Sequence, residues 1–180
     1  KNEAVRWFEK AAQEGHVKAQ SALAELSFHE GDHEGAVKWF RMAAESGDPV
    51  SQATLGGMYK RGPGVPQDYQ QAVKWYRMAA EQGYVPAQRE LAIMYEQGLG
   101  VMMDYREAEK WYRQAADANG GMPAMQLDLG KFYERCRQDY QQAAQWYQKA
   151  LDGKDERARD ALRKLMDRQK QEASQSQPDN

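Results

Sequence analysis

All five tryptophans of this chain occur in copies of one short pattern, and this repetition constrains the fold more than any other feature. An alanine lies three residues before each tryptophan, and a phenylalanine or tyrosine follows it. Successive copies are 32 to 36 residues apart, at Trp7, Trp39, Trp75, Trp111 and Trp146. A fixed period in this range is typical of a solenoid of stacked supersecondary units.

Each tryptophan lies in a predicted helix whose end is well marked. Alanine follows four residues after the tryptophan, as in Trp75 and Ala79, so both lie on one helix face. A glycine then follows, as expected just past a helix C-terminus, at Gly15, Gly47, Gly83 and Gly120. Prolines that favour the start of the next helix come at Pro49, Pro86 and Pro123.

A second helix in each unit has its own pattern. Leu55-Gly56-x-x-Tyr59 recurs as Leu91-Ala92-x-x-Tyr95 and Leu129-Gly130-x-x-Tyr133, while Leu23-Ala24 has Ser27 in place of tyrosine. Leucine and tyrosine four residues apart share a face, and the small residue beside leucine permits close approach of another helix.

Glycine-rich loops follow two of these second-pattern helices. They are Gly62-Pro63-Gly64-Val65 and Gly98-Leu99-Gly100-Val101. An aspartate comes next at Asp68 and Asp104, and after a shorter loop at Asp139, with Gln or Glu three residues later. This spacing resembles a capping box, so we expect a helix to start at each aspartate.

These patterns predict an all-α fold, an α/α superhelical solenoid of helix–turn–helix repeats with a C-terminal capping helix. The first (A) helices are expected at 17–30, 49–61, 85–97 and 123–135, and the second (B) helices at 1–14, 34–46, 69–82, 105–118 and 139–152. The capping helix is expected at 155–170. We expect a single domain of about 4.5 repeats over 1–170 and a disordered polar tail over 171–180.

These residues resemble the Sel1-like repeat family, a relative of the tetratricopeptide repeats. The family pattern runs Ala, Leu-Gly, Tyr, Gly-x-Gly-Val, Asp, Ala-x-x-Trp-Tyr-x-x-Ala-Ala and a closing Gly. Residues 51–83 match it almost throughout and 87–120 nearly as well, while the junctions at 31–33 and 136–138 lack the Gly-x-Gly-Val loop. The single cysteine, Cys136, excludes the branch with a disulfide in each repeat.

The resemblance implies a non-catalytic scaffold or adaptor for protein–protein interaction, with no cofactor. In bacteria such proteins often work at the cell envelope, so the resemblance favours a bacterial periplasmic or envelope location. The cytoplasm stays open as an alternative, because residues 1–7 read as the middle of a structural unit and so suggest a chain cut from a longer protein.

The resemblance also implies that the A helices line a concave surface that binds the partner. The side opposite the predicted core of the third A helix holds Arg89, Ile93, Glu96 and Gln97. Equivalent positions in the other A helices give Glu25, Phe28, His29, Lys60, Arg61, Lys131, Glu134 and Arg135, together with Leu127. A peptide with apolar anchors and an acidic end or C-terminal carboxylate fits this mixture.

Composition excludes several other classes of protein. The 25 basic and 27 acidic residues give a net charge of −2, which argues against nucleic-acid binding. No apolar run is long enough to span a membrane. The partner is therefore expected to be a protein or peptide, with a larger complex as one form of assembly.

Two alternatives remain open. His29-Glu30-Gly31-Asp32-His33 spells the zinc-protease motif, but Gly31 and Asp32 fall at an expected turn, so we expect no metal site and no enzyme activity. An envelope-associated module for a polysaccharide or peptidoglycan fragment would require exposed aromatic residues, such as Phe28, Tyr69 or Tyr105, grouped in one cleft.

Overall fold

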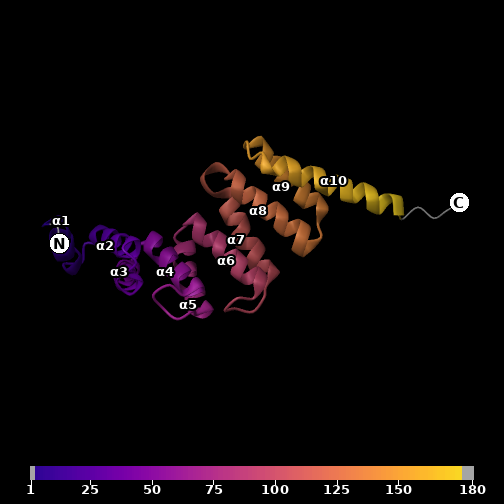
Figure 1. Cartoon of the computed structure of the whole chain (residues 1–180). Coiled ribbons are helices and arrows are strands. Elements are labelled where there is room, and N and C mark those ends of the chain that lie inside the picture. Colours follow the sequence, from indigo (N-terminus) through magenta and orange to yellow (C-terminus); the bar gives the residue numbers. More distant parts are fainter. Residues whose placement is uncertain (1–2, 176–180) are drawn as a thin grey trace. The chain divides into compact units, whose positions relative to one another are not determined.

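The computed structural model describes residues 3–175, which form helices joined by short turns and loops (Figure 1). Within these residues there are ten α-helices. They are α1 (Glu3–Gln13), α2 (Val17–His29), α3 (His33–Glu45), α4 (Pro49–Arg61), α5 (Tyr69–Glu81), α6 (Val85–Gln97), α7 (Tyr105–Asp117), α8 (Pro123–Phe132), α9 (Tyr140–Asp152) and α10 (Arg157–Gln175). A 3-10 turn (Ala118–Gly120) follows α7, and a π-helical segment (Tyr133–Arg137) follows α8.

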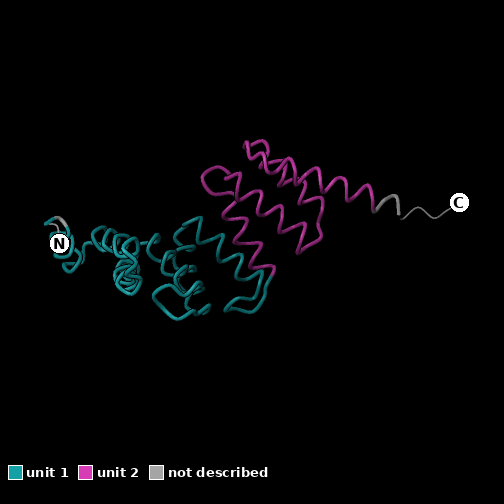
Figure 2. The backbone as a smooth tube through the Cα atoms, viewed as in Figure 1, with its two compact units in different colours: residues 1–104 teal, residues 105–180 magenta. Residues whose placement is uncertain are grey.

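The chain forms two compact units, residues 1–104 and residues 105–180 (Figure 2). Unit 1 contains α1–α6, and unit 2 contains α7–α10. The A helices are α2, α4, α6 and α8, and each packs with its neighbouring B helices inside its own unit. The predicted all-α architecture of helix–turn–helix repeats with a capping helix is confirmed.

The capping helix α10 packs on α9 and buries Ala158 and Leu165. Helix α10 starts at Arg157 and continues to Gln175, five residues past the predicted boundary of the polar tail. Residues 176–180 of that predicted tail lie outside the described residues. The assignment of one domain over 1–170 stays a prediction.

The tryptophan pattern forms the core between A and B helices. Trp75, Trp111 and Trp146 are buried, as are the aromatic residues that follow them. Trp7 differs, because its side chain is 65% exposed. Helix α3 packs on both α2 and α4, whereas α1 packs on α2 and no helix of the described residues covers its other side.

Two glycines of the Leu-Gly-x-x-Tyr pattern permit close packing of A on B helices. A Cβ on Gly56 would lie 3.0 Å from the Tyr76 ring, and one on Gly130 would lie 2.5 Å from the Tyr147 ring. These distances are too short for a methyl group without movement of the ring, so the predicted close approach at this position is confirmed.

A buried glutamine near the start of three A helices was not predicted. The Nε2 atoms of these glutamines donate to backbone carbonyls in the last turn of the preceding B helix, at 3.0 to 3.2 Å. The pairs are Gln20 with Ala12, Gln52 with Ala44 and Gln88 with Ala80. Each of these carbonyls also accepts the backbone N–H of the glycine that follows the B helix, so the glutamine adds a second donor and joins the start of the A helix to that turn.

One backbone hydrogen bond closes every junction between an A helix and its B helix. The N–H of the aspartate before the B helix donates to the carbonyl at the tyrosine position of the A helix, at 2.9 to 3.1 Å. The pairs are Asp32 with Ser27, Asp68 with Tyr59, Asp104 with Tyr95 and Asp139 with Tyr133. The junctions with and without the Gly-x-Gly-Val loop therefore share one closing geometry.

The predicted helix-capping role is confirmed for Asp68 and Asp139, and Asp32, for which no cap was predicted, caps α3 in the same way. Oδ1 of Asp68 accepts from the backbone N–H groups of Gln70 and Gln71, and Oδ1 of Asp139 accepts from that of Gln142. Oδ1 of Asp32 accepts from the N–H of Gly35. Each bond satisfies a donor that the first helical turn leaves unpaired.

Candidate functional site

Four of the predicted binding residues line one groove in unit 1. The cavity is about 340 Å³ and lies between α2 and α4, over α3. Its lining consists of Glu25, Phe28, His29, Phe40, Thr54, Met58 and Arg61. We call this cavity the α2–α4 groove.

The lining of the α2–α4 groove is apolar in its depth and charged at its edges. Phe40 and Met58 are buried, whereas the Phe28 side chain is 40% exposed and its ring lies 4.9 Å from that of His33. Glu25 and Arg61 are exposed, and within residues 3–175 neither has an ion-pair or hydrogen-bond partner. The groove thus combines an accessible aromatic surface with two charges that have no ion-pair partner among the described residues.

Unlike Arg61, the predicted basic residues Lys60 on α4 and Arg89 on α6 each have an ion-pair partner. Nζ of Lys60 lies 2.8 Å from Oε2 of Glu90, and Nη1 of Arg89 lies 3.3 Å from its Oε1. Burial, and then the Glu90 carboxylate, raise the pKa of the nearby Tyr76 to about 12, while Arg61 opposes this shift. Glu90 was missed in the sequence, although it stands one residue after the predicted Arg89.

The remaining predicted positions on α6 and α8 are not all at the surface. Gln97 is exposed and Ile93 is half-buried, but Glu96 is only 8% exposed. Leu127 on α8 is 1% exposed. The expectation of a surface position is therefore wrong for Glu96 and Leu127.

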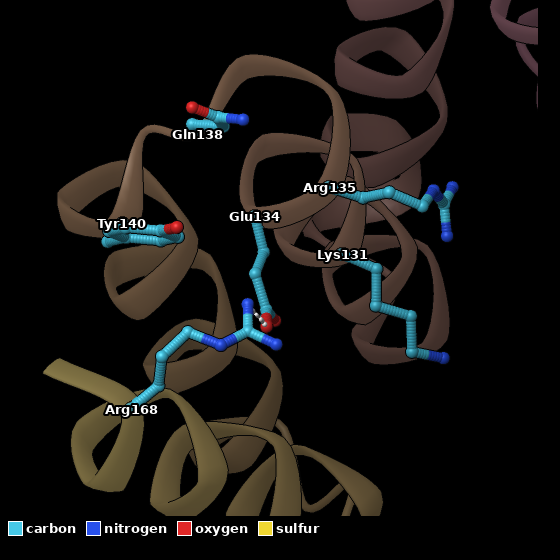
Figure 3. Close-up of a pocket in the computed structure, with 6 residues that line it drawn as sticks. All are labelled: Lys131, Glu134, Arg135, Gln138, Tyr140 and Arg168. Carbon is cyan, nitrogen blue, oxygen red and sulfur yellow. Dashed lines mark hydrogen bonds and ion pairs between the residues drawn. The ribbon is translucent and has the colours of Figure 1, made fainter. Parts of the chain in front are cut away.

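In unit 2, Lys131, Glu134 and Arg135 line a hollow of about 450 Å³ together with Gln138, Tyr140 and Arg168 (Figure 3). Arg168 reaches from α10 toward Glu134, with 3.1 Å between Nη1 and Oε1. The Tyr147 hydroxyl donates to Oε2 of Glu134 at 2.7 Å. Glu134 therefore joins the π-helical segment after α8 to α9 and α10.

The surroundings of this hollow perturb one ionisable group strongly. Burial, and then the hydrogen bond to Glu134, raise the pKa of Tyr147 well above its ordinary value. Its hydroxyl therefore stays protonated and keeps donating to Glu134 across the physiological range. Nζ of Lys131 lies 3.6 Å from Oδ1 of Asp128, so this predicted cation also has a neighbour of opposite charge.

A repeated arginine–tyrosine pair was also missed in the sequence. The arginine two residues after a tryptophan donates to the tyrosine hydroxyl of the next A helix, at 2.7 Å for Arg41 with Tyr59 and 2.5 Å for Arg77 with Tyr95. Arg113 donates to Tyr133 in the same way. The recurring Trp-aromatic-Arg triplet is the signal that predicts these pairs.

The zinc-protease motif does not lie on one helix. His29 is the last residue of α2 and His33 is the first of α3, with Gly31 at φ +83° between them. The expected turn at this motif is therefore confirmed. Among the described residues there is no group of three or more His, Cys, Asp or Glu side chains arranged to hold a metal ion.

The aromatic residues named for polysaccharide binding do not gather around the α2–α4 groove. Phe28 lines this groove, whereas Tyr69 is half-buried elsewhere in unit 1. The Tyr69 hydroxyl accepts a hydrogen bond from Nε2 of Gln67 at 3.1 Å. In unit 2, the half-buried Tyr105 packs edge-on against Phe132. In residues 3–175 there is no helix of the length and apolarity needed to cross a membrane.

Comparison with known proteins gives a consistent result. Sel1 repeat matches cover residues 49–84, 85–120 and 123–155, more than half of the chain, and a tetratricopeptide repeat match covers 2–50. A comparison with curated proteins gave no match.

Three solved structures resemble the chain. One is c5321, a protective antigen present in uropathogenic Escherichia coli strains and displaying an SLR fold, with 36% identity and a TM-score of 0.77 over 88% of this chain. Another is a Sel1 repeat protein from Oxalobacter formigenes, with 35% identity and a TM-score of 0.70 over 88% of this chain. MamA, with 17% identity and a TM-score of 0.63 over 87% of this chain and 90% of its own, shares the fold.

The chain spans 35% of the length of c5321 and 47% of the length of the Oxalobacter protein. The Sel1 matches begin at the first residue of α4 and continue through α9, and the tetratricopeptide match covers α1 to α3. The chain therefore belongs to the Sel1 repeat family, whose tetratricopeptide-like repeats are protein–protein interaction modules.

Proposed function

We propose that this chain is a non-catalytic scaffold or adaptor that binds a partner protein or peptide on the predicted concave face of its A helices. The observation that carries the proposal is the α2–α4 groove, which is lined by both the accessible Phe28 ring and the unpaired Arg61. Residues that dominate binding energy at protein interfaces are enriched in aromatic and arginine side chains.

The surface chemistry favours a peptide that has apolar anchors and an acidic group. Apolar side chains gain free energy by leaving water for the groove. A carboxylate can form two parallel hydrogen bonds with a guanidinium, which adds geometric selectivity.

The proposal is tested by selecting a phage-displayed random peptide library against the immobilised chain. The test variant reverses the charge of three predicted binding residues, Arg61→Glu, Arg89→Glu and Arg135→Glu. The matched control reverses three lysines that precede a tryptophan on B helices, Lys38→Glu, Lys74→Glu and Lys110→Glu, all of them exposed. Both variants change the net charge equally.

We expect peptides that the unchanged chain and the control variant enrich and that the test variant does not. Far-UV circular dichroism of all three proteins checks that each is folded. Failure to enrich any peptide, or equal loss in both variants, would contradict binding on the A helices.

A further inference from the structure

The two junctions between A helices in unit 1 are filled by different chemistry. Aligning α2, α4 and α6 on their Leu-Gly/Ala patterns places Phe28 at the position of Lys60, and Thr54 at the position of Glu90. Between α4 and α6, Lys60 and Glu90 form an ion pair that joins the two helices. Between α2 and α4, the equivalent Phe28 and Thr54 line an open groove.

The B helix beneath each junction also differs, with a polar aromatic residue under the α4–α6 junction and an apolar one under the α2–α4 groove. Tyr76 lies under the α4–α6 junction, where its hydroxyl is close enough to Glu90 for that carboxylate to affect its pKa. Phe40 is the equivalent residue in α3 and has no hydroxyl. The Thr54 hydroxyl donates to the Val50 carbonyl in its own helix, at 2.9 Å, and so does not bridge to α2.

The volume of the α2–α4 groove suits a single large side chain or two small ones. Its 340 Å³ lies near the lower end of the range of ligand pockets, about 300–1,000 Å³. Phe28 provides the accessible apolar surface, and the buried Phe40 and Met58 form the floor of the groove. An apolar side chain of a partner would therefore lose contact with water on the side that faces Phe28 and this floor.

Arg61 supplies a cation at the edge of this groove. Its guanidinium lies over Gly57, because a Cβ on Gly57 would be only 2.9 Å from Nη2 of Arg61. The equivalent positions on the three other A helices, Glu25, Ile93 and Lys131, have side chains that would occupy this space. Glu25, on the opposite helix, repels a carboxylate and so restricts an acidic group to the α4 edge.

We propose that the α2–α4 groove is the anchor site for peptides in which a leucine or aromatic side chain enters the groove and a neighbouring aspartate or glutamate pairs with Arg61. This inference rests on the proposed peptide-binding function and names the chemistry of its ligand. The α4–α6 junction takes no such anchor, because its own ion pair fills the equivalent position.

The probe is an array of synthetic glycine–serine peptides that pair one central residue (Leu, Phe, Trp or Ser) with a neighbouring Glu, Gln or Lys. The peptide that retains most of the unchanged chain is then labelled, and its dissociation constant is measured by fluorescence anisotropy. We expect an apolar residue beside Glu to be preferred over the same residue beside Gln by about tenfold.

Four variants assign this preference to the groove. Phe28→Ala and Arg61→Gln should each weaken binding by about tenfold, and Arg61→Gln should also remove the preference for Glu over Gln. Gly57→Ala keeps every binding side chain but displaces the Arg61 guanidinium, so it should weaken the Glu peptide and leave the Gln peptide unchanged. Leu26→Ala is the matched control, because Leu26 is 38% exposed on the same helix as Phe28 but lies outside the groove.

The outcomes separate this inference from the proposed function. Peptides that bind with no preference for Glu, or a preference that persists in Arg61→Gln, would overturn the anchor assignment and leave peptide binding intact. Equal weakening by Leu26→Ala and Phe28→Ala would also overturn it. If neither the array nor the displayed library gives any bound peptide, the proposed function fails as well.

Discussion

Replacing Gly100 with alanine should destabilise unit 1 more than replacing Gly83, although both glycines have a positive φ. Gly100 has φ +69° and Gly83 has φ +81°. A Cβ on Gly100 would lie 2.4 Å from the carbonyl carbon of Tyr69, whereas a Cβ on Gly83 would have no atom within 4 Å. The pair therefore separates the cost of the left-handed backbone from the cost of steric overlap.

The expected magnitudes follow from these two terms. A non-glycine residue in the left-handed region costs about 1–2 kcal/mol, which applies to both variants. Inserting atoms into a space already occupied costs about 1–3 kcal/mol more, which applies only to Gly100→Ala because the overlap is with backbone at the start of α5. For a chain of this size, each kcal/mol lowers Tm by about 2–4 °C.

Thermal unfolding followed by circular dichroism at 222 nm measures both variants against the unchanged chain. Gly64→Ala provides a replicate in the preceding repeat, because a Cβ there would lie 2.3 Å from the carbonyl oxygen of His33, at the start of α3. Equal Tm values for Gly83→Ala and Gly100→Ala would refute the reasoning. In that case the second glycine of the loop would serve only the backbone angle and not the contact with the preceding repeat.

Three further predictions concern buried polar groups, alkaline pH and metal. Gln52→Leu should lower the free energy of unfolding in urea by about 1–3 kcal/mol, because it removes the donor to the Ala44 carbonyl and the acceptor for Gln82. A decrease no larger than that caused by Gln82→Ala would contradict this prediction. Burial, and then Glu90, raise the pKa of Tyr76 from 10.0 to about 12 in the folded chain. As pH rises, the unfolded chain therefore loses the Tyr76 proton before the folded chain does. The stability that comes from this difference is complete below pH 10 and is lost as pH rises toward 12. Tyr76→Phe should therefore show a smaller fall in Tm between about pH 9 and pH 11 than the unchanged chain, and identical falls would rule out Tyr76 as a source of the alkaline loss. Adding zinc or EDTA should leave Tm unchanged, because His29 and His33 lie on different helices. A rise in Tm with zinc would instead support a metal site at these histidines.

The helices could be predicted closely because their ends are marked by local chemistry. Pro49 and Pro123 begin helices, and Gly62 and Gly98 end them in the left-handed conformation. Aspartates cap the B helices α3, α5 and α9. These effects act within a few residues of the chain, so a single sequence contains them in full.

The π-helical segment after α8 could not be predicted by the same reasoning. Tyr133–Arg137 has no glycine or proline, and the turn is made by Gln138 at φ +51°. The closing bond from Asp139 to Tyr133 nevertheless has the same form as at the longer loops. The chain therefore adjusts the helix to meet the closing bond where the loop is short.

For the predicted binding surface, periodicity identified most of the positions that point away from the core, with Glu96 and Leu127 as exceptions, but not how they pair. Lys60 meets Glu90 across 30 residues, and the Ser21 and Ser51 hydroxyls lie 3.1 Å apart across the same separation. Such contacts join neighbouring repeats, so they depend on the offset between two A helices as well as on position within one. The helical period alone carries no information about this offset.

That offset decides which part of the predicted surface is free to bind. One junction places a lysine opposite a glutamate, and the ion pair occupies the space between its helices. The preceding junction places Phe28 opposite Thr54 at the same two positions, and the space stays open beside an unpaired Arg61. Two junctions built from one repeated pattern thus differ in whether the space between their A helices is open, and the proposed anchor site lies at the open junction.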